Sequence, residues 1–204
     1  MDTKSVLSFS SVLLVIAGYI PYIYAIVRGR DLPRGTPGKV EPSKASWLIW
    51  ATLDVVIIWG MALEGTVNSQ IVAVVIGVWV TVFFVLRYGV PGWTNLDWFC
   101  LAGAVVGIVL IIFSSPVLGI ITSLAVVCIG SIPTFVSAWQ DPGRENKLAW
   151  NLFTASSICT TIGIPKWTWA DAAQPIAFLS VQGIMMYILY IKPMMRADAK
   201  KQVG

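Results

Sequence analysis

Long apolar runs alternate with short polar stretches along the whole chain. Runs of this length that contain few charges are typical of helices that cross a lipid bilayer. Together they cover most of the 204 residues, which leaves no room for a soluble domain. The predicted fold class is therefore an all-α integral membrane protein. Seven spans are expected, at about residues 6–28, 46–64, 69–88, 96–114, 116–139, 148–164 and 172–192.

Composition supports this assignment. The chain is 57% hydrophobic and 12% charged, whereas soluble domains carry about 25% charged residues. The mean hydropathy is +0.79. The net charge of +4 does not indicate a nucleic-acid partner, because the basic residues lie in short loops between apolar runs. The lipid bilayer is the partner that the composition predicts.

Several kinds of chemistry are disfavoured by the residue types present. The chain has no histidine, which excludes imidazole metal ligands and histidine proton relays. Cys100, Cys128 and Cys159 lie in apolar runs without a Cys-x-x-Cys pair, so packing roles are expected. No nucleophile has a plausible base nearby, and Lys192 lies too near a span's end to hold retinal. We therefore expect no enzyme activity, no metal site and no cofactor.

The distribution of basic residues predicts the orientation of the spans. Lysine and arginine gather after the first, third, fifth and seventh runs, and cytoplasmic loops carry the excess of positive charge. The N-terminus is therefore expected outside and the C-terminus in the cytoplasm. The residues concerned are Arg28, Arg30, Arg34, Lys39, Lys44, Arg87, Arg144, Lys147, Lys192, Arg196, Lys200 and Lys201.

Two short motifs recur in the same order. A Gly-x-x-Pro motif inside the first apolar run, residues 18–21, returns in the fifth run at 130–133. A Lys-x-x-Trp block at 44–47 returns at 147–150. In both copies a third apolar run follows and ends at a basic residue. Such agreement in order and helix count indicates an internal duplication.

The duplication predicts the domain organisation. Residues 1–92 form a first three-helix repeat, and residues 116–204 form a second repeat with a cytoplasmic tail. Three crossings invert a chain, so the extra helix within 93–115 restores the orientation and makes the repeats parallel. Parallel repeats of this kind occur in transporters, with the binding site between the repeats near the midplane.

The repeated prolines interrupt helical hydrogen bonding in both copies. A proline inside a helix removes a backbone donor, and the preceding glycine adds local flexibility. Pro21 with Gly18, and Pro133 with Gly130, are therefore predicted to be paired hinges of a cytoplasmic gate. Static kinks that only shape the bundle remain an alternative.

This three-plus-one-plus-three plan, with a proline in the first helix of each triplet, resembles the SWEET and PQ-loop transporter superfamily. The resemblance implies transport of a small polar solute, such as a sugar, an amino acid or a vitamin-like molecule, by alternating access. It also implies aromatic contacts from the second helix of each triplet, here Trp50 and Trp150. Uncharacterised bacterial members resemble the chain most, which implies a bacterial inner membrane. A non-transporting receptor of the same fold is the alternative, and a homo-oligomer is left open.

Asp54 is the main candidate for the site. It falls near the middle of the second span, where a carboxylate costs several kcal/mol to bury and is by default a functional hypothesis. Two functional roles are open: binding a polar or cationic group of a solute, and taking up a coupling proton. A structural role, as a protonated and hydrogen-bonded acid, is the alternative.

The second repeat supplies the other candidates. Ser157 occupies the position equivalent to Asp54 and is expected to face it across the axis, on a polar stripe with Thr154. Asn151, one turn inside the sixth span, and Gln182, near the middle of the seventh, complete the predicted binding site. For the hydroxyls, hydrogen bonds to their own helix are the competing explanation.

Overall fold

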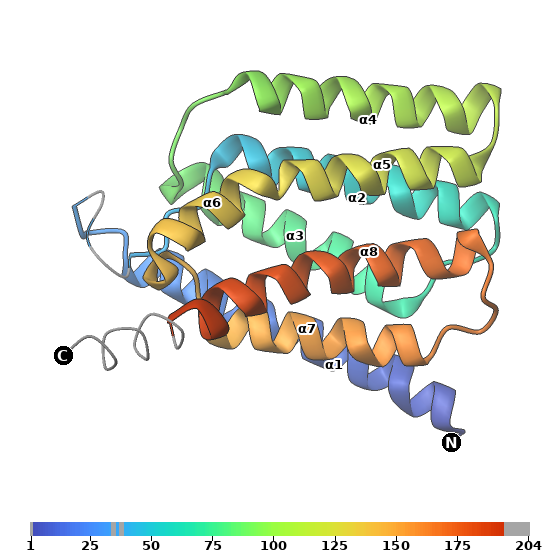
Figure 1. Ribbon diagram of the computed structural model, residues 1–204, viewed down its shortest axis with the longest axis horizontal. Helices are drawn as coiled ribbons and strands as arrows, with labels where there is room; N and C mark the ends of the chain where they lie inside the picture. Colours follow the sequence, from blue (N-terminus) through green and yellow to red (C-terminus); the bar gives the residue numbers. More distant parts are fainter. Residues whose placement is uncertain (1, 34–35, 37–38, 194–204) are drawn as a thin grey trace, which may run out of the picture.

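The computed structural model describes residues 2–33, 36 and 39–193 as a bundle of helices that run along one common direction (Figure 1). In this described part the only strand-like pairing is a single bridge between Ser43 and Val90. The predicted all-α class is therefore confirmed. Four basic residues used to predict orientation, Arg34, Arg196, Lys200 and Lys201, lie outside the described residues.

The helices follow the apolar runs closely. They are α1 (Thr3–Arg28), α2 (Lys44–Leu63), α3 (Ser69–Tyr88), α4 (Asn95–Phe113), α5 (Pro116–Gly130), α6 (Ile132–Gln140), α7 (Lys147–Ile162) and α8 (Trp169–Met186), with the 3₁₀ turn η1 (Pro142–Arg144) and the π-helical turn η2 (Tyr187–Ile191). Six segments are long and apolar enough to cross a membrane: α1, α2, α3, α4, α5 with α6, and α8 with η2. This confirms an integral membrane protein.

The sixth predicted span, 148–164, is shorter and more polar than the others. Helix α7 has 16 residues, which gives a length of about 24 Å against a hydrocarbon core of about 30 Å. It packs extensively against α1 and also against α8. Seven crossings therefore remain a prediction, while six candidate spans are found.

The outward surface of the bundle is apolar, as a lipid-facing surface must be. Phe83 is 72% exposed and Phe113 is 81% exposed, and many aliphatic side chains on the other helices are exposed as well. A monomer in water rarely exposes contiguous apolar surface on this scale. Lipid is the environment that suits this surface.

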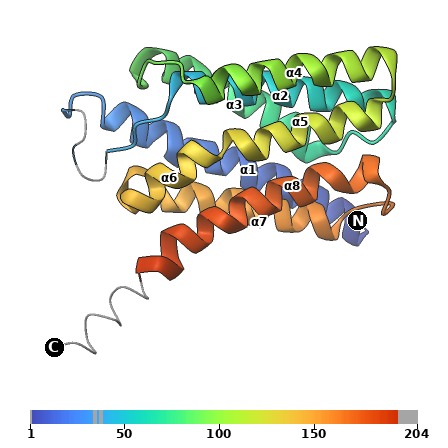
Figure 2. The same ribbon diagram turned by 45° about the horizontal axis from the view of Figure 1, so that its top comes forward.

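Helix contacts define the order of packing. Helix α3 contacts both α1 and α2, and α8 contacts both α5 and α7. Contacts of α1 with α7 and of α2 with α5 join these two groups. Helix α4 packs on α5 and α2, and it lies at the edge of the bundle in both views (Figures 1 and 2).

Small residues on α4, Gly103 and Gly107, allow this helix to approach α5 closely. A Cβ atom on Gly103 would lie 2.4 Å from Val126, and one on Gly107 would lie 2.4 Å from Ser123 Oγ. Ala104 between them is buried. The absence of side chains at these positions permits the backbone contact.

Side-chain caps define several helix starts. The Asn68 Oδ1 atom accepts a hydrogen bond from the Ile71 N–H at 3.0 Å, and Asn146 Oδ1 accepts one from Ala149 N–H at 2.9 Å. Asp97 and Thr94 form a reciprocal capping box at the start of α4. Such caps satisfy backbone donors that the first helical turn leaves unpaired.

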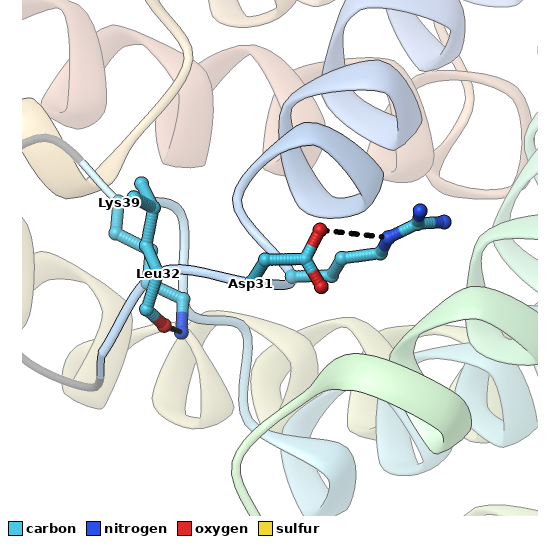
Figure 3. Close-up of polar contacts among 4 residues, drawn as sticks. Asp31, Leu32 and Lys39 are labelled. Carbon is cyan, nitrogen blue, oxygen red and sulfur yellow. Dashed lines mark hydrogen bonds and ion pairs between the residues drawn. The ribbon is translucent and has the colours of Figure 1, made fainter.

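The loop between α1 and α2 is held locally by charged side chains (Figure 3). Arg30 Nε lies 3.2 Å from Asp31 Oδ2, and Lys39 Nζ donates to the Leu32 carbonyl oxygen at 2.7 Å. Lys39 also lies 3.4 Å from Glu41. The basic residues of this loop are therefore partly neutralised by neighbours from the same loop.

The two prolines of the repeated motif have different structural effects. Helix α1 continues through Pro21 without interruption. Around Pro133 the helix is interrupted at Ser131, where α5 ends and α6 begins. Ser131 Oγ donates to the Val127 carbonyl oxygen at 2.8 Å, which gives this carbonyl a side-chain partner at the break. The repeated motif therefore interrupts its helix only in the second copy.

The two glycines of the motif differ in how closely they are packed. Alanine substitutions at these positions therefore form a matched pair of variants. A Cβ on Gly18 would lie 2.6 Å from the Phe153 ring, whereas a Cβ on Gly130 would meet nothing closer than 3.4 Å. We expect Gly18→Ala to destabilise the protein by about 1–3 kcal/mol through overpacking. Gly130→Ala should change stability by about 1 kcal/mol or less. Melting temperatures of the purified variants in detergent test this, and equal values would contradict the packing difference.

Candidate binding cavity

A small cavity lies in the middle of the bundle, between the two groups of helices. This central cavity has a volume of about 110 Å³ and is lined from α1, α2, α3, α5, α7, α8 and the break at Ser131. Seven of the lining side chains are aromatic. They are Tyr19, Tyr22, Trp47, Trp50, Trp150, Phe153 and Phe178.

Asp54 is the acidic member of this lining. It projects from α2, and only 4% of its surface is exposed. Within the described residues, no side chain or backbone group forms a hydrogen bond or ion pair with Asp54. Buried carboxylates are normally paired, because an unpaired one loses its hydration without compensation. The cavity therefore contains an acid that lacks a protein partner.

Two further polar atoms in the cavity wall also lack partners. Trp50 Nε1 is a buried donor and Gln182 Oε1 is a buried acceptor, and neither has a hydrogen-bond partner in the described part of the chain. Both residues line the central cavity together with Asp54. Unsatisfied buried polar groups are uncommon in native proteins, so these two atoms, in one cavity with Asp54, suit a bound polar ligand.

The aromatic wall is held by contacts among its own rings. Tyr22 and Trp47 have ring centroids 5.1 Å apart, and Trp47 and Trp50 are 5.7 Å apart. On the opposite side Tyr19 and Phe153 lie 5.0 Å apart, and the Tyr19 hydroxyl donates to the Val74 carbonyl oxygen at 3.4 Å. Packed aromatic pairs of this kind fix ring orientation before any ligand binds.

Of the predicted site residues, Asp54, Trp50, Trp150 and Gln182 line the central cavity together. Thr154 and Asn151 do not belong to this lining. The Thr154 hydroxyl donates to the Trp150 carbonyl oxygen of its own helix at 2.7 Å. Asn151 Nδ2 donates to the Tyr190 hydroxyl at 2.8 Å, which joins α7 to η2.

Ser157 also lies outside the central cavity, contrary to the expectation that it would face Asp54. It is fully buried two turns beyond Trp150, where its hydroxyl accepts a hydrogen bond from Gln70 Nε2 at 2.9 Å. The side chain of Gln70 on α3 therefore occupies the space next to Ser157. Ser157 therefore belongs to a separate hydrogen-bonded structure, which does not line the central cavity.

That structure is a continuous chain of side-chain hydrogen bonds, called here the amide layer. Asn68 Nδ2 donates to Gln174 Oε1 at 2.8 Å, and Gln174 Nε2 donates to Gln70 Oε1 at 3.2 Å. Gln70 Nε2 donates to both Ser156 Oγ and Ser157 Oγ at 2.9 Å. Ser156 in turn donates to the Ser11 carbonyl oxygen at 2.8 Å. The amide layer thus joins α3, α8, α7 and α1.

A second, larger hollow opens on the other side of the amide layer. This vestibule has a volume of about 730 Å³ and lies at the N-terminal end of α1. Its polar lining includes Lys4, Ser5, Ser8, Ser11, Thr66, Asn68, Ser69, Thr160 and Asp171. Ser11 Oγ is buried there without a hydrogen-bond partner among the described residues.

The order along each helix places the amide layer between the two spaces. On α1 the vestibule is lined by Ser8 and Val12, and the central cavity by Val15 and Tyr19. On α7 the vestibule is lined by Thr160 and the central cavity by Phe153, with Ser156 and Ser157 between them. The amide layer therefore separates the vestibule from Asp54.

At the opposite end, two residues before α7 connect the loop to the cavity wall. Trp150 Nε1 donates to Glu145 Oε2 at 2.9 Å, and Asn146 Nδ2 donates to the Pro21 carbonyl oxygen at 3.2 Å. Asn146 thus caps α7 and contacts the Pro21 turn of α1 at the same time. These contacts lie beside the central cavity, which Trp150 lines, on the side away from the vestibule.

Burial raises the pKa of Glu145 from its usual 4.5 to about 7, against the opposing effect of the Trp150 hydrogen bond. Between these values the unfolded chain loses the proton while the folded protein keeps it. The stability contributed by this group is therefore present at acidic pH and is lost as pH rises from about 4.5 to about 7.

The variant Glu145→Gln tests this dependence. It should flatten the decline in melting temperature between pH 5 and 7, and it should be more stable than the wild type at pH 8. Glu64→Gln, at an exposed position, is the control and should follow the wild-type curve. Parallel curves for the wild type and Glu145→Gln would contradict the assignment.

No protein-family model, curated protein or solved structure matches this chain.

Proposed function

We propose that the protein transports a small polar solute across a membrane by alternating access. The observation that carries this proposal is Asp54, a buried acid with no hydrogen-bond partner among the described residues, in a cavity lined largely by aromatic rings. A site inside the bundle can serve transport only if it opens alternately to the two sides of the membrane. The amide layer and the Glu145 and Asn146 contacts are suited to act as the two barriers.

The helix contacts support the duplicated architecture proposed from the sequence. If α1, α2 and α3 correspond to α5, α7 and α8, exchanging the two sets converts the α1–α7 contact into the α5–α2 contact. The same exchange relates the position of α3 to that of α8. Helix α4, within 93–115, packs at the edge and fits the role of a linker between repeats 1–92 and 116–204.

This arrangement is the basis for proposing membership of the SWEET and PQ-loop superfamily. The resemblance favours a bacterial inner membrane, with the N-terminus outside and the C-terminus in the cytoplasm. In that orientation the vestibule faces outward, and Glu145 and Asn146 lie at the cytoplasmic end. The proposed hinges are the interruption at Ser131 and the turn of α1 at Pro21, where the proline removes a backbone hydrogen bond. Each lies near the cytoplasmic barrier.

A receptor of the same fold is less well supported. Such a protein is expected to line its cavity with basic residues that hold an anionic cargo group. In the described part of the chain, the central cavity is lined by neither lysine nor arginine. A cavity with one acidic side chain among aromatic rings instead favours a transporter, whose solute binds and is then released.

Flux measurements test the proposal. The purified protein in proteoliposomes should take up at least one solute from a panel of sugars, amino acids, vitamins and organic cations, faster than protein-free liposomes do. The panel is run with and without a pH gradient, which separates facilitated from proton-linked uptake. A solute that binds the protein but never crosses the bilayer would favour the receptor instead.

A further inference from the structure

We infer that the central cavity binds a compact alkylated ammonium group, held against Asp54 and enclosed by the aromatic wall. This inference rests on the proposed function, since it names the class of solute that the same site would carry. Its first support is charge. Asp54 is the acidic lining residue, and no lysine or arginine in the described part of the chain lines the cavity beside it. A cationic ligand would supply the missing partner and offset the cost of burying the carboxylate.

The second support is the aromatic wall. Seven rings, from α1, α2, α7 and α8, line the same cavity as this carboxylate. Aromatic faces attract cations, and several rings around one site are the usual means of recognising quaternary ammonium groups. A metal cation is a poorer fit, because hard cations require several oxygen ligands and this wall consists mainly of rings and aliphatic side chains.

The rings on α2 are the best placed for this role. Trp47 and Trp50 precede Asp54 by about two turns and one turn, respectively, so the three residues lie along one face of the helix. Tyr22 packs on Trp47, and Trp47 packs on Trp50. The carboxylate and the aromatic platform are therefore parts of one rigid element.

Volume and polarity limit the ligand further. At about 30 Å³ for each water in the liquid, 110 Å³ holds roughly four waters, which suits a compact head group better than a whole sugar ring. The remaining unpaired groups are one donor, Trp50 Nε1, and one acceptor, Gln182 Oε1. Such a site matches a quaternary ammonium that carries a single hydroxyl, and choline is the simplest probe of this class.

A pair of isosteric ligands provides the decisive experiment. Choline and 3,3-dimethyl-1-butanol have the same shape, but only choline carries the positive charge. Titration calorimetry with the purified full-length protein should give at least a tenfold lower Kd for choline than for the neutral alcohol. Equal affinities, or no choline binding by folded protein, would overturn the inference.

Variants assign the binding to this cavity. Asp54→Asn and Trp47→Leu should each weaken choline binding at least tenfold, while Trp93→Leu, at an exposed tryptophan outside the cavity, should leave it unchanged. Gel filtration and melting curves establish that each variant is folded, and Trp50→Leu, which also removes a ring of the cavity, replaces Trp47→Leu if that variant misfolds. Choline binding that survives both cavity substitutions would overturn the assignment.

Uptake measurements separate this inference from the proposed function. Choline that binds but does not cross the proteoliposome membrane would retain the ligand class and contradict transport. Uptake of a neutral solute by protein that does not bind choline would retain transport and contradict the ligand class.

Discussion

Replacing Asp54 by asparagine should reduce solute uptake roughly ten- to a hundredfold while leaving the protein folded. Asparagine has nearly the same shape but cannot carry the charge. Hydrogen bonds to charged groups contribute about 1.5–3 kcal/mol, and each 1.4 kcal/mol corresponds to a factor of ten in affinity. Folding should be unaffected or improved, because an unpaired buried carboxylate costs free energy in the native state.

Asp97→Asn is the matched control for this experiment. Asp97 is also buried and acidic, but its Oδ2 atom accepts hydrogen bonds from the Thr94 backbone and hydroxyl, both at 2.7 Å, at the start of α4. We expect Asp97→Asn to lower the melting temperature and to leave the uptake rate per folded protein near that of the wild type. Uptake that is unchanged in Asp54→Asn, including its response to a pH gradient, would remove Asp54 from the mechanism.

The two roles of Asp54 are distinguished by the same variant. A coupling acid that is replaced by asparagine leaves the solute site occupied but uncouples it, so exchange of solute persists and the pH gradient no longer drives accumulation. A binding acid that is replaced loses both exchange and accumulation. Measuring exchange and gradient-driven uptake in parallel therefore separates the two.

The main candidate for the site could be found from the sequence because it breaks the local pattern. Asp54 is a single acid within an apolar run, and such a residue is conspicuous regardless of how the helix is rotated. The six candidate spans follow for the same reason, since bilayer thickness sets a minimum length for an apolar run. Trp50 and Trp150 were expected in the site only by resemblance, and both line the central cavity.

The amide layer could not be found in this way. Gln70 and Gln174 lie near the starts of their spans, where a polar residue is ordinary in a membrane protein. Whether they point inward depends on the rotation and depth of each helix, and these are set by packing rather than by periodicity. The same uncertainty in depth explains why Ser157, aligned with Asp54 by the repeat, contacts Gln70 instead of the central cavity. Likewise, the repeated proline motif did not indicate that only the second copy interrupts its helix.

Gln70→Leu should both destabilise the protein and open the vestibule side of the central cavity. Gln70 takes part in three hydrogen bonds of the amide layer, and leucine would leave the Gln174 amide without an acceptor in a fully buried position. Each buried polar group left unpaired costs about 1–3 kcal/mol, so a loss of several kcal/mol in stability is expected. Ser180→Ala, which removes an exposed hydroxyl bonded only to its own helix, should change stability little.

The opening can be measured separately from the stability. In a background where Cys100, Cys128 and Cys159 are replaced by alanine, a cysteine at position 131 reports on the central cavity, which Ser131 lines. If the amide layer is the barrier toward the vestibule, Gln70→Leu should accelerate labelling of this cysteine by a membrane-impermeant thiol reagent added on the vestibule side. Reagent added on the Glu145 side should label it at an unchanged or lower rate, because weakening one barrier shifts the population toward the state open on that side. Acceleration from both sides would instead indicate general loosening of the bundle, and the layer would then be a structural support rather than a gate.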